Sequence, residues 1–165
     1  MRRIFKKLTS FRRDDRGIQL VELAIALPVM VLLFAAAAEF GRYFQEYTTL
    51  AKGTRMAARY MATACANGSD DLTAKNLVVY GNEAGTGNPI VNELSVDNVS
   101  IVKRNAAGAV TSGFPTTITI QIVDFQHKPL FNLGKLMGNS VSLAIDIKPS
   151  VTMRYLLTQS PLCAP

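Results

Sequence analysis

One acidic residue, Glu22, lies inside a long apolar stretch of the chain and is the side chain best placed to do chemistry. From Ile18 to Ala38 the only other strongly polar residue is Gln19. A carboxylate in the hydrocarbon of a membrane is costly, by about 2.5 kcal/mol or more for an acidic residue at the centre of a spanning helix. We therefore expect Glu22 to require a cationic partner and to form an ion pair inside a membrane.

Few other residues could form a catalytic or metal site. Two cysteines and one histidine cannot supply the four ligands of a structural zinc site. The sequence contains no phosphate-binding loop, serine nucleophile elbow or zinc-protease motif. His127 lies beside Lys128 and Pro129 in a predicted loop, so we expect a solvated side chain, and we expect Asp70 and Asp71 to start or cap a turn. These patterns predict a protein that is not an enzyme and binds no cofactor or metal.

The two cysteines, Cys65 and Cys163, both follow the apolar stretch. Membrane insertion would place them in an oxidising compartment, where disulfides persist. We expect a disulfide between them, which would close a loop of about 100 residues and stabilise the domain by up to about 4.7 kcal/mol in the chain-entropy model. Two separate thiols, or a disulfide between two chains, are the alternatives.

The apolar stretch itself, residues 18–38, predicts a transmembrane helix, because 21 residues rising about 1.5 Å each span the hydrocarbon core. Pro28 lacks an N–H donor and predicts a kink or a local break. Seven of the 18 Lys and Arg residues precede this stretch, so the positive-inside rule places the N-terminus in the cytoplasm. The remaining chain is nearly neutral. Basic residues crowded before an apolar stretch are typical of membrane topology, whereas a nucleic-acid binder spreads them over a folded face, so we expect membrane lipid and not nucleic acid as a partner.

Residues 39–64 predict an amphipathic continuation of this helix, ending before Asn67 and Gly68. Apolar or small residues recur at steps of three and four, which is one stripe of a helix: Phe40, Tyr43, Phe44, Tyr47, Leu50, Ala51, Thr54, Ala57, Ala58 and Met61. Charged residues occupy other faces, with Arg42 and Glu46 one turn apart. They predict a solvated face, and four are also candidates for contacts between subunits: Glu39, Arg42, Arg55 and Arg59.

Beyond Gly68 the hydrophobic pattern changes to a period of two, which is typical of strands with one buried face. The pattern predicts strands at residues 76–80, 94–104, 116–124 and 141–151. Gly, Pro and Asn mark the joins between them, at residues 81–89, 105–115 and 126–139. A short helical turn is expected at Leu130–Met137. None of the joins is a convincing crossover helix, so we expect antiparallel pairing.

The predicted fold class is therefore α+β. A long N-terminal transmembrane helix continues outside the membrane, and its apolar stripe covers the apolar face of a small antiparallel sheet. The chain divides into a basic leader at 1–17, a helix at 18–64 and a β-rich domain at 65–165.

The N-terminal helix resembles that of TadE-like pseudopilins, which are related to type IV pilins. The resemblance rests on the segment DRGIQLVELAIALPVMVLLFAAAAEFGRYFQEYTTLAKGTRMAARYMA. In that family a basic leader ending in Gly precedes an apolar helix with Glu at its fifth position, then a Pro, a Glu-Phe-Gly-Arg run and an Ala-Arg-rich helix. The stretch KNLVVYGNEAGTG and the closing strand ending in VTMRY are also similar.

The resemblance implies a pilin-like fold and cleavage between Gly17 and Ile18 by a prepilin peptidase. The freed ammonium of Ile18 in a neighbouring subunit would then pair with Glu22 and set the axial register of a filament. The resemblance also implies a minor, non-enzymatic subunit in the assembly of Tad or Flp pili, which serve surface adherence and biofilm formation.

The partners that the resemblance implies are the prepilin peptidase, the Tad inner-membrane assembly platform, a TadF-like pseudopilin and the Flp pilin. The expected location is the bacterial inner membrane, with the C-terminal domain in the periplasm or carried into an extracellular pilus.

Two other interpretations of the N-terminus stay open from the residues alone. The chain could keep an uncleaved anchor with Glu22 near the membrane interface, or lose a signal peptide cleaved after Ala36–Ala38 and before Glu39. Either would leave a membrane-tethered or secreted binding module that is not incorporated in a pilus.

Overall fold

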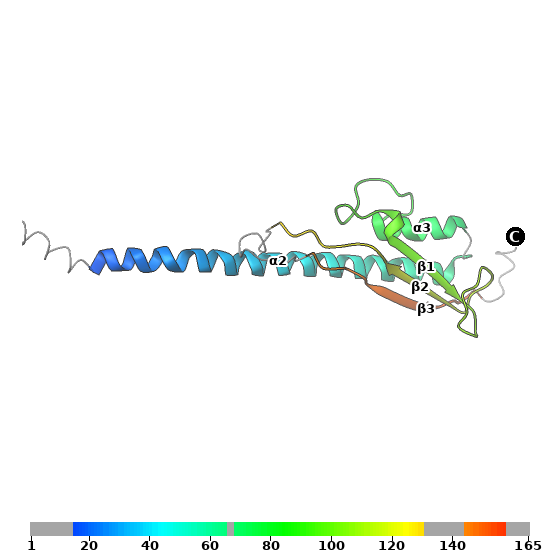
Figure 1. Ribbon diagram of the computed structural model, residues 1–165. Coiled ribbons are helices and arrows are strands. Elements are labelled where there is room, and N and C mark those ends of the chain that lie inside the picture. Colours follow the sequence, from blue (N-terminus) through cyan, green and yellow to red (C-terminus); the bar gives the residue numbers. More distant parts are fainter. Residues whose placement is uncertain (1–14, 66–67, 131–143, 158–165) are drawn as a thin grey trace, which may run out of the picture. The chain divides into compact units, whose positions relative to one another are not determined.

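The computed structural model describes residues 15–65, 68–130 and 144–157, which belong to two compact units that meet after Gly41 (Figure 1). Helix α2 (Asp15–Thr63) supplies the first unit and continues into the second, called here the outer unit. The outer unit also contains, in chain order, α3 (Gly68–Val79), the short helix η2 (Val96–Asn98), β1 (Val99–Arg104), β2 (Thr117–Ile122) and β3 (Ser150–Arg154).

Helix α2 confirms the predicted long N-terminal helix and ends one residue earlier than expected. It passes through Pro28 without interruption, so the predicted local break does not occur, and a kink there stays a prediction. Proline in a helix interior removes one backbone hydrogen bond and costs about 3 kcal/mol or more. In membrane helices such a residue is tolerated because neighbouring helices, hydroxyl side chains or a local adjustment of the helix satisfy the freed carbonyl group.

The three strands form one antiparallel sheet in the order β1-β2-β3, which confirms the predicted pairing. β2 is central, and Ile120 lies opposite Ile101 of β1 and Val151 of β3. Along β2 the buried and half-buried side chains alternate strictly, with all three isoleucines on the buried face. This is the period of two that the sequence predicts.

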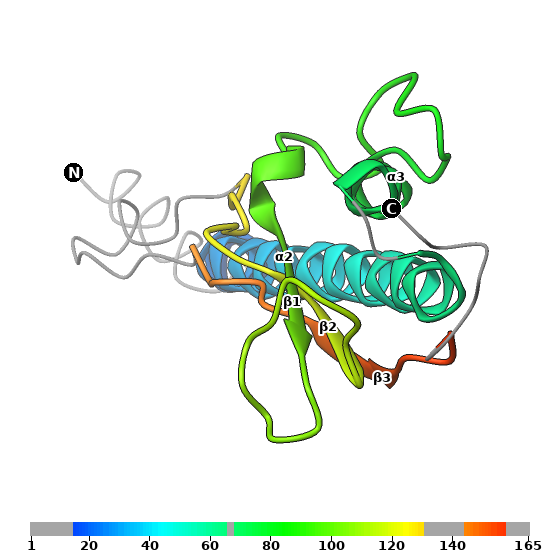
Figure 2. The ribbon, with the colours of Figure 1, turned by 90° about the vertical axis from the view of Figure 1, so that its right-hand side faces the viewer.

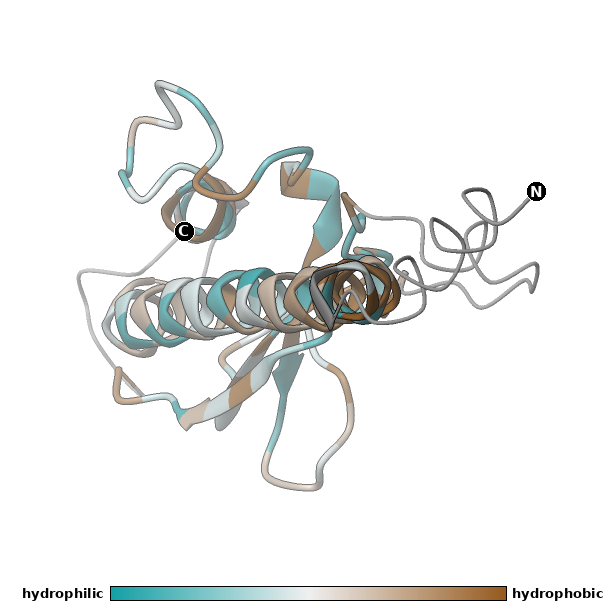
Figure 3. Cartoon of the chain, turned by 90° about the vertical axis from the view of Figure 1, so that its left-hand side faces the viewer, coloured by the Kyte–Doolittle hydropathy of each residue, from teal (hydrophilic) through white to brown (hydrophobic). Residues whose placement is uncertain are grey.

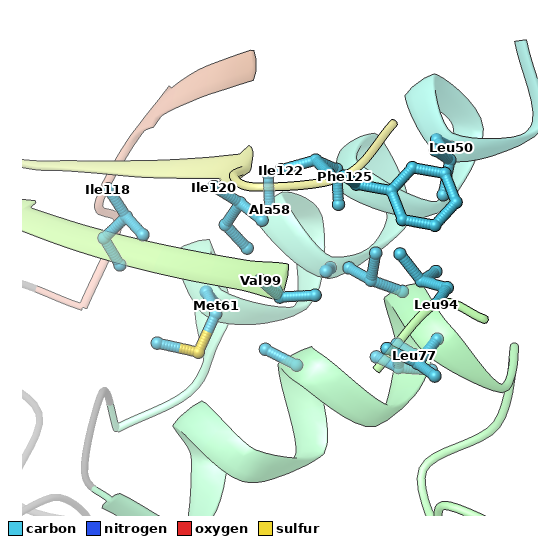
Figure 4. Close-up of a cluster of buried hydrophobic side chains, with 14 of the residues drawn as sticks. Leu50, Ala58, Met61, Leu77, Leu94, Val99, Ile118, Ile120, Ile122 and Phe125 are labelled. Atoms are coloured by element: carbon cyan, nitrogen blue, oxygen red, sulfur yellow. The ribbon is translucent and has the colours of Figure 1, made fainter. Parts of the chain in front are cut away.

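The core of the outer unit lies between α2 and the buried face of the sheet (Figure 4). Helix α2 contributes fully buried residues at helical spacing: Leu50, Ala57, Ala58 and Met61. The sheet contributes Val99, Ile118, Ile120 and Ile122. The predicted packing of the helix stripe on the sheet is thus confirmed from Leu50 onward, whereas the earlier stripe residues Phe44 and Tyr47 are exposed by 66% and 40%.

Residues 76–80 do not form the predicted strand, because they end or follow α3. Ala74, Leu77 and Val78 are buried at helical spacing, so the packing of a helix overrides the strand preference of Leu-Val-Val-Tyr. α3 lies close to α2 at Gly53, where an added Cβ would stand 3.3 Å from the carbonyl oxygen of Val78. The missing side chain at Gly53 lets the two helices approach.

Two strand boundaries also differ from the prediction. β1 begins at Val99 rather than at residue 94, because the preceding residues form η2, where the backbone N–H of Ser95 donates to Asn98 Oδ1 at 3.0 Å. β3 occupies 150–154 rather than 141–151. Pro149, which has no N–H donor, directly precedes it. Residues 141–143, and the helical turn expected at Leu130–Met137 apart from Leu130, lie outside the described residues.

β3 is an edge strand, as Figure 2 shows. The carbonyl of Pro149 accepts from Ile122 N–H at 3.1 Å, and Tyr155 N–H donates to Thr116 O at 2.9 Å, so odd-numbered residues direct their backbone groups toward β2. Backbone groups of the even-numbered residues 150, 152 and 154 therefore point outward. No hydrogen bond within the described part of the chain engages them.

Candidate membrane and assembly site

The first unit consists of a helix whose large apolar side chains are exposed. It is the one helix in the described part of the chain that is long and apolar enough to cross a membrane. Its large apolar side chains from Ile18 to Phe34 are 52–70% exposed, apart from Leu32, which is half-buried. In Figure 3, where the chain is coloured by hydropathy, the N-terminal part of α2 is hydrophobic and its later turns alternate between hydrophobic and hydrophilic residues. Exposed apolar area costs about 25 cal/mol per Å² in water, so this surface requires a lipid or protein environment.

Glu22 lies within this surface, and its side chain is exposed like those of its apolar neighbours. Gly17 and Ile18 lie in the first turn of α2, and no atom of another element approaches within 4 Å of a Cβ built on Gly17. The first four N–H groups of a helix have no acceptor within the helix, so its first turn opens at low cost. A protease could therefore bind this segment in an extended form after local unwinding.

The outer unit begins with a polar cluster around Glu46. One carboxylate oxygen lies 2.6 Å from His127 Nδ1, and the other lies 3.8 Å from Arg42 Nη2, which confirms the predicted one-turn spacing of Arg42 and Glu46. The His127 ring also meets the Tyr43 ring edge-on, with the centroids 5.7 Å apart and the planes at 84°. Tyr43 and Glu46, on adjacent turns of α2, thus both contact the imidazole ring of His127.

The prediction of a solvated His127 is wrong, because its side chain is only 1% exposed. The segment after β2 folds back over α2, and the backbone N–H of His127 donates to Ile145 O at 2.9 Å. Phe125 and His127 are buried, whereas Asp124, Gln126 and Lys128 are exposed. This alternation is one residue out of phase with that of β2, whose buried residues are even-numbered, and the change of phase falls beside Asp124, which has φ 51°. The sequence signal that could have identified His127 as buried is therefore its spacing of two from the aromatic Phe125.

A cavity of about 190 Å³ lies beside the same cluster. It is lined by residues of α2 and of the loop after α3: Arg42, Gln45, Glu46, Thr49, Ile90, Val91 and Asn92. Ligand pockets for small molecules usually have volumes of about 300–1,000 Å³ and are mainly apolar. The small size and polar lining of this cavity favour a structural role over a binding site for an organic ligand.

The four residues predicted to contact other subunits lie in different environments. Glu39 is buried, at 3% exposed, and Arg42 is half-buried. Arg55 and Arg59 are exposed on the outer unit, and neither contacts another charged side chain within the described part of the chain. Of these four residues, only Arg55 and Arg59 present a positive charge without an ion-pair partner in the described part of the chain.

Asp70 and Asp71 lie in the first turn of α3, where carboxylates are favoured by the helix dipole. Asp70 Oδ1 accepts a hydrogen bond from Tyr60 Oη at 3.2 Å. Lys103 Nζ lies 2.8 Å from both carboxylate oxygens of Asp71, which connects α3 to β1. The two carboxylates thus help to hold α3 against α2 and the sheet.

Residues 15–65, 68–130 and 144–157 contain no group of three side chains that could hold a metal ion.

Cys65 follows α2 in the outer unit, and no free cysteine occurs among the described residues. Cys163 lies outside them, so its disulfide with Cys65 stays a prediction.

Comparison with known proteins places a family match on α2. The model of the TadE-like protein family matches residues 17–59, from the predicted cleavage position to the basic turns of the outer unit. No curated protein and no solved structure matches the chain. The match confirms the resemblance to the TadE-like family over residues 17–59. The N-terminal helix is therefore similar to that of TadE-like proteins, which suggests a role related to Tad pili.

Proposed function

We propose that the chain is a pseudopilin, cleaved between Gly17 and Ile18 by a prepilin peptidase, that acts in the assembly of Tad or Flp pili. The observation that carries this proposal is that the family match begins at Gly17 and includes Glu22 within an exposed apolar helix. A structural role of this kind needs no catalytic residues. It needs an anchor, a processing site and a surface for other subunits.

Glu22 and the new N-terminus would act together. Cleavage creates a positive ammonium on Ile18, in the same apolar segment as the carboxylate of Glu22. An ion pair between the ammonium of one subunit and Glu22 of its neighbour would offset the cost of about 2.5–3.5 kcal/mol for an acidic residue in the bilayer. Because the pair forms only at one axial offset, it would set the register between subunits.

The basic leader supports an orientation with the N-terminus in the cytoplasm and the outer unit in the periplasm. There the outer unit would present its surface to the Tad assembly platform, a TadF-like pseudopilin and the Flp pilin, in the inner membrane or in a pilus. The resulting pili would serve adherence and biofilm formation.

Processing is tested by the N-terminal sequence and intact mass of the protein from its native membrane, in cells with and without the prepilin peptidase. We expect a start at Ile18 that is lost without the peptidase. A start at Glu39 would instead indicate a secreted module, and an intact Met1 in both strains would indicate a tethered domain, so either result would contradict the proposal.

The role of Glu22 is tested separately with Glu22→Ala and the neighbouring control Gln19→Ala. Both variants should be inserted and processed, because neither changes the cleaved bond or the basic leader. Only Glu22→Ala should lower the number of pili per cell, counted by electron microscopy. Equal piliation of the two variants would exclude a register function for Glu22.

A further inference from the structure

The outward face of α2 in the outer unit carries three cations at helical spacing: Lys52, Arg55 and Arg59. All three side chains are exposed, and Met56 among them is 42% exposed. Thr54 and Ala58, which lie between these cations in the sequence, are fully buried and face the core. The cations therefore lie on the opposite side of the helix. This set, Lys52, Arg55, Met56 and Arg59, is called the basic face below.

No cation of the basic face has an ion-pair partner in the described part of the chain. Like charges three or four residues apart on a helix repel each other. By contrast, Lys103 is paired with Asp71 and Lys148 with Asp146. The basic face is therefore a site where positive charge is gathered without internal compensation.

An acidic patch lies beside α3, formed by Asp70 and Glu83. Asp70 Oδ1 accepts a hydrogen bond from Tyr60 Oη at 3.2 Å, and Asn76 of α3 donates to the backbone carbonyl of Glu83 at 3.1 Å. Both acids therefore lie beside α3. The charge of each also contributes to the raised pKa of Tyr60, whose largest cause is burial. Glu83 is exposed, and its carboxylate has no partner among the described residues.

The basic face and the acidic patch occupy the same position along α2, because Tyr60 directly follows Arg59. Consecutive residues on a helix point about 100° apart, so Tyr60 and Arg59 face different sides. Figure 2 shows α3 on one side of α2 only. The two charged surfaces therefore cannot meet within one chain, but they can meet between two copies without a shift of one copy along the other.

We propose that the basic face of one copy binds the acidic patch of a second copy, side by side. Two copies anchored in one membrane in the same way hold equivalent residues at equal height, which is what this contact requires. The contact joins different surfaces of the two copies, so it is heterologous and can continue to a third copy as a row or a ring. It rests on the membrane anchoring in the proposed function, but not on cleavage or on entry into a pilus.

Photocrosslinking of the full-length chain in its native membrane tests this contact. A benzophenone-bearing amino acid replaces Met56, which lies within the basic face and is exposed. We expect an adduct of twice the chain mass, with the crosslink mapped by mass spectrometry to the partner copy's residues 68–90. High salt should lower its yield, because exposed charges are screened.

Charge reversal then identifies the two surfaces. Arg55→Glu with Arg59→Glu should lower the yield roughly tenfold or more, because like charges across an interface are strongly disfavoured. Adding Glu83→Lys in the same chain should raise the yield again. The matched control is Arg154→Glu, which reverses an exposed cation on β3 and should change nothing. Thermal unfolding of each variant verifies that the fold is kept.

The absence of a double-mass adduct, a crosslink to another part of the second copy, or an adduct with a different protein would each overturn the proposal. The N-terminal residue, read from the same samples, separates this result from the proposed function. Cleavage at Ile18 without the adduct leaves the pseudopilin proposal intact, and the adduct without cleavage contradicts only that proposal.

Discussion

Glu46 contacts the side chains of Arg42 and His127, and the two contacts differ in strength because only His127 is buried. The 2.6 Å contact with His127 lies against the core, whereas Arg42 is 3.8 Å away with a half-exposed side chain. Exposed ion pairs contribute about 0–1 kcal/mol. A buried polar group left without its partner costs more, about 1–3 kcal/mol. The stability of this cluster therefore depends mainly on the pair of Glu46 and His127.

Replacement of Glu46 by alanine should accordingly destabilise the outer unit by about 1–3 kcal/mol, because His127 loses the acceptor at Nδ1. The change can be measured by urea unfolding of the full chain in detergent micelles, followed by circular dichroism. Gln45→Ala is the matched control, since Gln45 is its exposed neighbour on α2 and a surface change usually costs less than about 0.5 kcal/mol. Equal unfolding midpoints for the two variants would contradict the assignment.

The raised pKa of Tyr155 predicts that the protein loses stability at alkaline pH. Burial, and secondarily the charge of Asp70, raise its pKa above the ordinary value of 10.0. The folded state thus favours the neutral phenol, whose stabilisation is complete below pH 10.0 and is lost as the pH rises through the raised pKa. The pKa of Tyr60 is also raised, again mainly because of burial.

Tyr155→Phe should lower stability by about 1 kcal/mol at neutral pH, because the hydroxyl donates to Ala64 O at 2.9 Å. The variant should then lose less additional stability than the parent between about pH 8 and about pH 11, since one titrating phenol is gone. Urea midpoints at both pH values measure the difference. An alkaline loss as large as that of the parent would exclude Tyr155 as a source.

Single residues were predictable where local spacing decides their contacts. The one-turn distance from Arg42 to Glu46 is visible in the sequence, and the structure confirms their contact. The burial of His127 depends on a partner 81 positions away, so no local pattern specifies it. Only its alternation with Phe125 pointed toward the core.

At the scale of elements, the contact between α2 and α3 depends on the missing side chain of Gly53. An added Cβ would lie 3.3 Å from Val78 O and 3.4 Å from Val78 Cα, both of which are backbone atoms that can move only with the whole helix. Gly53→Ala should therefore separate the helices and destabilise the outer unit by about 1–3 kcal/mol, as overpacking usually does.

Gly41→Ala provides the matched control, because no atom lies within 4 Å of a Cβ built there. Alanine is favoured over glycine inside a helix by about 1 kcal/mol, so this variant should be neutral or stabilising. Thermal unfolding of both variants measures the contrast. A Gly53→Ala variant as stable as the parent would show that the contact between α2 and α3 can accommodate a methyl group at residue 53.

The elements that follow one strong period were predicted correctly, and those that depend on tertiary contacts were not. The second half of α2 has a period of 3.6 and β2 has a period of two, while the first half of α2 is uniformly apolar, and both elements were found near the predicted bounds. α3 was mistaken for a strand because its final residues, Leu77, Val78 and Val79, favour strands locally. Its packing beside Gly53 involves residues about 25 positions earlier in the chain, which local propensity does not include.

Across the whole molecule, the predicted disulfide would connect the end of α2 to the C-terminal segment. Reduction, or the pair of substitutions Cys65→Ser and Cys163→Ser, should lower the stability of the outer unit by up to about 4.7 kcal/mol, because the unfolded chain gains the entropy of an open loop. Urea unfolding with and without a reductant measures the loss. An unchanged midpoint, with free thiols absent before reduction, would show that the cysteines pair between chains.

The general organisation of the molecule was predictable because it follows from composition. A basic leader, an apolar stretch and an alternating Val, Ile and Thr pattern are each recognisable without structural information. The division after Gly41 falls inside a continuous helix. No break in the sequence marks it, and only the distribution of contacts reveals it.

The unpaired outer edge of β3 is a hazard that membrane anchoring would reduce. Two such edges from different copies could join antiparallel, as exposed edge strands do in aggregates. That arrangement relates the copies by a two-fold axis perpendicular to the sheet, which also reverses the direction of the α2 segment packed on it. Chains that enter one membrane from the same side cannot adopt opposite directions. Anchoring would thus act as a safeguard against sheet-to-sheet aggregation, and a fragment released from the membrane would lose that protection.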